Sequence, residues 1–192
     1  MKLSTDQILG GLALAAGAVV LFMLGKKAAS PYGTFSDNPG RQRVAEVALS
    51  QVGQGGNGDY MQLYLVPGDT VEDSYVRPAD AINKPPTGGA VFWCGIFALW
   101  VLHQAGLIRE VKWKWGEGFA SMLPTTANPK AGDIGYMNAW NHHDIVLGVQ
   151  GDFVHTVDGN DGGSPGGIVK ENWQPRSKFA AFYSIGKLVG DP

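Results

Sequence analysis

The chain contains one cysteine, Cys94, and this residue follows Trp93 at the start of the apolar run CGIFALWVLHQA. A single thiol forms no intramolecular disulfide and no multi-cysteine metal site. Two interpretations remain, a buried small hydrophobe and a nucleophile. The first turn of a helix has unpaired N–H groups and the positive end of the dipole, and both favour a thiolate. This position makes a nucleophile as good an interpretation as a structural thiol.

A cysteine nucleophile needs a base, and the base needs a polar group that orients it. Of the four histidines, His103 falls on the far side of the apolar helix. His155 lies among strand residues and is more typical of a structural histidine. The adjacent pair His142 and His143 remains. Because neighbours on a strand point to opposite faces, one of them should face Cys94, but alternation alone does not say which.

The segment VDGN, at 157–160, follows the strand-like run DFVHT and supplies Asp158 and Asn160 as candidates for the orienting group. The same letters are also a good turn sequence. Both interpretations stay open at this stage.

A metal hydrolase built on His142, His143 and Asp144 is the competing enzyme class. Consecutive strand residues point to opposite faces and therefore chelate one ion poorly. The sequence contains no calcium-binding loop of the EF-hand type. We expect no metal and no cofactor.

The hydrophobic periodicity predicts helices first and a small antiparallel sheet afterwards. This order is typical of an α+β fold. The expected helices cover 41–52 and 94–105, the expected strands cover 133–137, 143–149, 152–157 and 178–185, and a hairpin turn falls at 150–152.

Composition excludes some functions. The formal net charge is −2 and no run of Lys or Arg is present, so we expect no nucleic-acid partner. Apolar residues make up 44% of the chain, which is enough for a core of ordinary size.

The N-terminus differs from the rest because residues 8–25 carry no charge and are closed by Lys26 and Lys27. The length and flanks favour an uncleaved transmembrane helix over a signal peptide. We therefore divide the chain into an anchor (1–27), a linker (28–40), a catalytic domain (41–188) and a tail (189–192). The positive charges that follow the apolar run would tend to keep the domain in the cytoplasm.

Four segments together resemble the CHAP-type peptidoglycan hydrolases of the papain-like NlpC/P60 superfamily. They are FWCGIFALWVLHQAGL, PKAGDIGYM, HHDIV and VDGN, in the order of that family. The resemblance covers roughly residues 41–188 and implies a papain-like fold, with the nucleophile helix packed on a small antiparallel sheet. It implies Cys94 as nucleophile, His142 as base with His143 as the alternate, and Asp158 and Asn160 as the polar partners.

The resemblance also implies hydrolysis of an amide bond in peptidoglycan, at the muramoyl–alanine link or within the stem peptide. Trp93, Trp113, Trp115 and Trp140 are candidates for a substrate groove. An anchored enzyme would contact lipid through 8–25 and, with the weak charge bias overridden, would face the periplasm or cell wall. It would also suit a phage virion, in the viral membrane or particle interior beside other virion proteins. The alternative is a degenerate, membrane-anchored structural or wall-binding protein.

Overall fold

The computed structural model describes residues 32–55, 70–72, 93–109, 112–114, 118–162 and 167–191, with the backbone alone for 70–72 and 112–114. The expected anchor at 8–25 lies outside these residues, and so do Trp115 and the side chain of Trp113. Within the part of the chain that is described, no helix has the length and apolar character needed to span a membrane.

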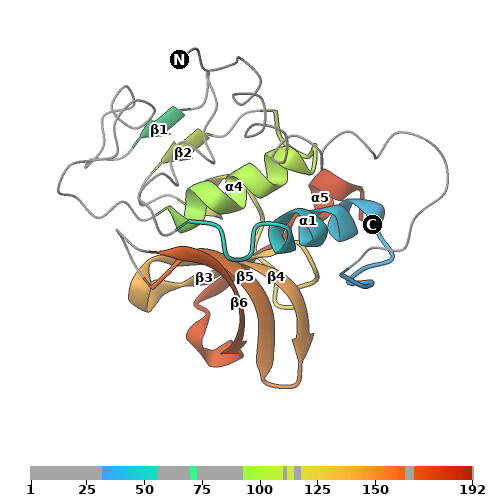
Figure 1. Cartoon of the computed structure of the whole chain (residues 1–192). Helices are drawn as coiled ribbons and strands as arrows, with labels where there is room; N and C mark the ends of the chain where they lie inside the picture. The colour runs from blue at the N-terminus through green and yellow to red at the C-terminus, as the bar shows by residue number, and fades with distance from the viewer. Residues whose placement is uncertain are drawn as a thin grey trace, which may run out of the picture. The chain divides into compact units, whose positions relative to one another are not determined.

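A five-stranded sheet with the order β6-β5-β4-β3-β7 forms one layer (Figure 1). All neighbouring strands in it are antiparallel. Its strands are β3 (Ile134–Met137), β4 (His142–Gln150), β5 (Phe153–Asp161), β6 (Ile168–Pro175) and β7 (Ala181–Tyr183). A separate parallel pair joins β1 (Thr70–Glu72) to β2 (Lys112–Lys114). With the helices, this is an α+β arrangement.

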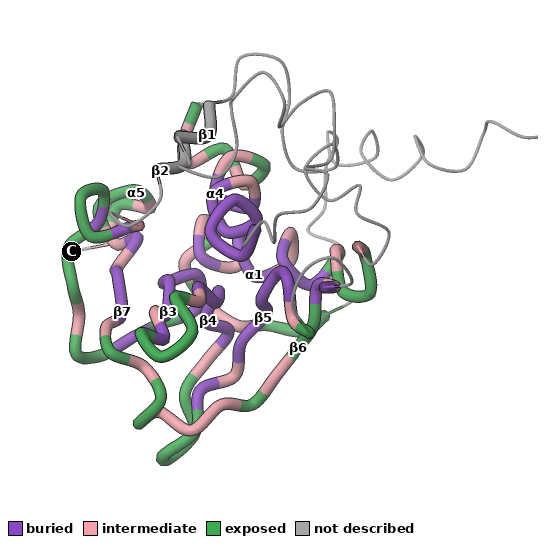
Figure 2. Tube along the Cα trace, turned by 90° about the vertical axis from the view of Figure 1, so that its left-hand side faces the viewer, coloured by how far each residue is buried: buried purple, intermediate pink, exposed green. Residues whose placement is uncertain are grey.

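The helices α1 (Pro39–Leu49) and α4 (Cys94–Gln104) cover one face of the sheet (Figure 1). The main core lies between them and the strands, where Phe97 and Leu99 join Ile145 and Val157 in one buried cluster. Figure 2 shows this core as the purple centre of the domain, with exposed residues at the far ends of the strands. The opposite face carries a smaller cluster around Val146.

Gly159 allows helix α4 to approach β5 closely. A Cβ atom at this position would lie 2.6 Å from Cζ3 of Trp93 and 2.7 Å from Cβ of Phe97. Because these distances are far below van der Waals contact, any larger residue would push α4 away from the strand. Glycine therefore sets the spacing between the start of α4 and the strand that carries Asp158.

The buried side chain of Arg41 ties the C-terminal residues to the sheet. Its Nη1 donates to Asp133 Oδ1 and to the carbonyl of Ala131, both at 2.7 Å, and its Nε donates to Asp191 Oδ2 at 2.7 Å. Asn38 also donates to Asp191, at 2.7 Å. Both carboxylates therefore depend on one guanidinium that is 2% exposed.

The compact unit extends beyond the expected catalytic domain at both ends. The folded unit begins at Tyr32 rather than at residue 41, because Phe35 packs against the main core and its N–H donates to Gln42 Oε1. The expected tail at 189–192 includes Asp191, which is bonded to Arg41 as described above.

The expected elements also needed correction. The strand at 178–185 shrinks to β7, because the one-turn helix η4 (Arg176–Lys178) precedes it and α5 (Gly186–Val189) follows. The N–H of Ile185 donates to the Asp133 carboxylate instead of a strand partner. Strand β6 was not expected, because this edge strand places only Val169 in the core and shows little alternation. The turn at 150–152 is confirmed, with Gly151 at φ 56°.

Candidate active site

Cys94 is the first residue of α4 and is 2% exposed. Its Sγ lies 4.0 Å from Nδ1 of His143 and 3.8 Å from the carbonyl oxygen of Asn141. Trp93 gives the helix no side-chain cap. The thiol therefore sits beside the N–H groups of a first helical turn, where an anion is favoured.

The two adjacent histidines control the ionisation of this thiol. Burial raises the pKa of Cys94, but hydrogen bonding and charge interactions with His142 and His143 outweigh burial and lower the pKa to about 6. A cysteine with this pKa is largely a thiolate at neutral pH.

His143 lies on the sheet face that α4 covers. It pairs in register with Tyr136, and its ring centroid is 5.0 Å from that of Tyr136 and 5.3 Å from that of Phe119. Phe119 belongs to the one-turn helix η2 (Gly118–Ser121). The ring is thus held between two aromatic side chains, with Nδ1 towards the sulfur of Cys94.

His142 reaches the carboxylates of β4 and β5. Its Nε2 donates to Asp158 Oδ2 at 2.8 Å and lies 3.4 Å from Asp144 Oδ1. Burial lowers the pKa of His142, but the bond to Asp158 and the interactions with Cys94 and Asp144 raise it to about 11. The imidazole is therefore cationic at neutral pH, as the partner of a thiolate would be.

Asp158 and Asn160 lie within strand β5, so the turn interpretation of this segment was wrong. The strand continues to Asp161 through an irregularity in its pairing with β6, and Asn160 there has φ 66°. Of the two candidates, Asp158 is the one bonded to the imidazole of His142.

Asn172 is a site residue that the sequence interpretation missed. It lies on β6, the strand that was not expected, and its Nδ2 donates to Asp158 Oδ1 at 2.8 Å and to Asp161 Oδ2 at 2.7 Å. The bond to Oδ1 of Asp158 leaves the other oxygen, Oδ2, to bind His142. The sequence carries no local signal for it, because the contact depends on the pairing of β5 with β6.

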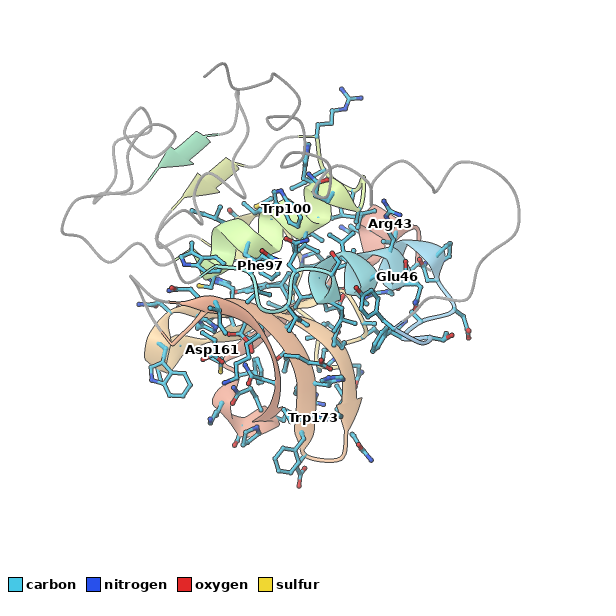
Figure 3. The ribbon with its side chains drawn as sticks, viewed as in Figure 1. Arg43, Glu46, Phe97, Trp100, Asp161 and Trp173 are labelled. Atoms are coloured by element: carbon cyan, nitrogen blue, oxygen red, sulfur yellow. The ribbon has the colours of Figure 1, made fainter. Side chains whose placement is uncertain are left out.

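The other two histidines are placed as expected for structural residues. His155 bonds Glu171 at 2.6 Å and stacks on Trp173 at 4.4 Å between ring centroids. Figure 3 labels Trp173 at the end of the sheet far from α4. Nδ1 of His103 lies 3.2 Å from the carbonyl of Ile108.

The tryptophans divide between core and surface. Trp93 has no exposed surface and packs edge-on against Phe97. Its expected place in a groove is therefore corrected to a place in the core. Trp140, in the one-turn helix η3 (Asn138–Trp140), is 59% exposed and lies under Nζ of Lys178, 5.1 Å from the ring centroid.

Three potential metal ligands converge at His142, Asp144 and Asp158, whose ligand atoms all lie within 4.8 Å of one another. The set differs from the one that the sequence suggested. Asp158, across the strand pair from Asp144, takes the place of His143, which belongs to the other face.

Comparisons of the chain with protein-family models, with curated proteins and with solved structures found no match. The geometry alone therefore describes the class: an α+β domain with a buried cysteine beside two adjacent histidines, one of which is bonded to a carboxylate.

Proposed function

We propose that this chain is a cysteine-dependent hydrolase that cuts an amide bond in peptidoglycan, with a papain-like CHAP fold. The observation that carries the proposal is the arrangement of Cys94, His142 and Asp158. The thiol interacts with an imidazole whose Nε2 is held 2.8 Å from a carboxylate. Nucleophile, proton carrier and orienting group are the three parts that such a reaction requires.

The proposed reaction begins from a thiolate and an imidazolium. The sulfur of Cys94 attacks the amide carbonyl carbon, and the imidazolium of His142 gives its proton to the leaving amine. His142, now neutral, then takes a proton from water as the water attacks the thioester, which releases the acid and restores the thiolate. Asp158 stabilises the imidazolium and holds the ring.

The start of α4 supplies a place for the negative oxygen of the intermediate. The first N–H groups of a helix have no acceptor within it, and Trp93 provides no cap. The N–H of Cys94 is therefore a suitable donor to the oxyanion.

His142 is the proposed base because its ring is bonded to the orienting carboxylate of Asp158. His143 remains the alternate. The ring of His143 is fixed by Phe119 and Tyr136, and its Nδ1 faces Sγ. In this proposal it favours the thiolate without carrying the proton to the leaving group.

Peptidoglycan as substrate rests on the resemblance of four segments to the CHAP family. Trp140 adds support, because its ring is exposed and lies two positions before His142, where it offers a flat surface to a sugar or a peptide. An anchor at 8–25 would hold the domain at a bilayer. A place in the cell envelope or in a phage virion belongs to the same proposal.

The test is the release of amino groups from purified peptidoglycan by the full-length chain in mild detergent. We expect His142→Ala to lower kcat/KM by about 10²–10³-fold, since it removes the proton carrier. His155→Ala is the matched control, another strand histidine bonded to a carboxylate, and should keep full activity. Mass spectrometry of the products names the bond.

Three results would change the proposal. Loss of activity in His143→Ala but not in His142→Ala would transfer the base to His143. An unchanged rate in both variants would contradict the mechanism. A wild-type chain that is inert on walls of several chemotypes would favour the anchored structural or wall-binding protein.

A further inference from the structure

Asp144 is a buried carboxylate whose oxygens form no hydrogen bond of ordinary geometry with the described residues. The residue has no exposed surface. Burying a carboxylate without a hydrogen bond is costly. Two groups face it: Nε2 of His142, which is 3.4 Å away and already bonded to Asp158, and the hydroxyl of Thr156, which interacts with the carboxylate.

The side chains around Asp144 are those that bind a divalent metal ion. His142 and Asp144 lie two positions apart on β4, and Asp158 pairs with Asp144 across the strands. One nitrogen and two carboxylate oxygens come within 4.8 Å of one another, so one ion can bind all three.

The surroundings hold one of the ligands in the orientation that a metal would require. Asn172 donates to Oδ1 of Asp158 at 2.8 Å, which leaves Oδ2 towards His142. Such contacts, which orient a ligating carboxylate from behind, are a usual feature of metal sites.

We propose that His142, Asp144 and Asp158 form a binding site for one zinc ion. One imidazole nitrogen and two carboxylate oxygens are ligands that zinc accepts, and three protein ligands leave a fourth position open to water. Calcium prefers six to eight oxygen ligands, and magnesium retains several waters, so neither matches this set as well.

Zinc at this site would control the proposed hydrolase, and this consequence rests on the proposed function. The ion would occupy Nε2 of His142 and separate the imidazole from Asp158. His142 could not then carry a proton to the leaving amine. We expect zinc to inhibit hydrolysis and a chelator to restore it.

Binding is tested on the full-length chain, freed of metal with a chelator and titrated with zinc chloride in a calorimeter. We expect one site per chain, weakened about 100-fold or more in Asp144→Asn. Asp161→Asn is the matched control, since Asp161 also bonds Asn172 but is not one of the three ligands. His155→Ala excludes the pair His155–Glu171 as the site.

Cobalt as a substitute for zinc gives a readout that needs no variant. With one nitrogen and two oxygen ligands, the bound cobalt should show visible absorption bands. It should lack the intense near-ultraviolet band of a cobalt–thiolate bond. That intense band would show that Cys94 binds the metal and would overturn the proposed ligand set.

Near-ultraviolet circular dichroism checks that Asp144→Asn is folded.

The site is contradicted if zinc does not bind, or binds equally to wild type and Asp144→Asn. Zinc that binds through the three residues but leaves hydrolysis unchanged would overturn the inhibition. A chain that binds zinc yet shows no hydrolysis after chelation would instead contradict the proposed function, so the failures are distinguishable.

Discussion

Serine in place of Cys94 is expected to reduce kcat/KM on peptidoglycan by about 10⁴-fold or more. The hydroxyl is similar in size to the thiol, so the packing at the start of α4 is preserved. A serine hydroxyl does not ionise near neutral pH. The neighbouring imidazolium already carries its proton and cannot accept another from the hydroxyl. The variant therefore loses the proposed nucleophile while the fold remains. The measurement is the rate of amino-group release under conditions of excess substrate and of limiting substrate.

The control for this loss is the stability of the same variant. Its melting temperature should stay within a few degrees of wild type, because the change is small in volume. Full activity in folded Cys94→Ser would show that the thiol is a buried structural group and that the hydrolase proposal is wrong.

Arg41→Met is expected to lower the free energy of unfolding by about 3–5 kcal/mol. Methionine fills much of the same volume but removes the charge that compensates Asp133, which is 1% exposed, and Asp191. The buried carboxylate of Asp133 would keep its bond from the N–H of Ile185 but lose its counter-ion. Unfolding in urea, followed by tryptophan fluorescence, measures the change.

Lys130→Met is the matched control, since Nζ of Lys130 lies 3.7 Å from Asp191 but the side chain is 65% exposed. We expect a change of about 0–1 kcal/mol for this surface pair. Equal losses in the two variants would contradict the role of Arg41 as the buried link between α1, the sheet and the C-terminal residues.

The sequence predicted the elements whose patterns are local. The helix from Cys94 and the hairpin around Gly151 follow from hydrophobic periodicity and turn chemistry, and the structure contains both. Residue types also selected Cys94, His142 and Asp158, which the structure brings into contact.

What could not be predicted depends on contacts between strands. Alternation placed His142 and His143 on opposite faces but did not show that both interact with Cys94. Asn172 was missed because edge strand β6 has little apolar pattern. The proximity of Asp144 to Asp158 could not be predicted, because it depends on the cross-strand pairing of these two residues.

The ionisation of Cys94 tests the central claim most directly and needs no substrate. Because the chain has one cysteine, the far-ultraviolet absorbance of the thiolate, measured against Cys94→Ser over a pH series, reports this group alone. A group whose pKa is lowered ionises early as the pH rises, so the account predicts a midpoint of about 6. The alkylation rate with iodoacetamide should rise through the same midpoint. A midpoint near the ordinary value of 9.0 would contradict the account, because the thiol would then be protonated at neutral pH and the two histidines would not activate it.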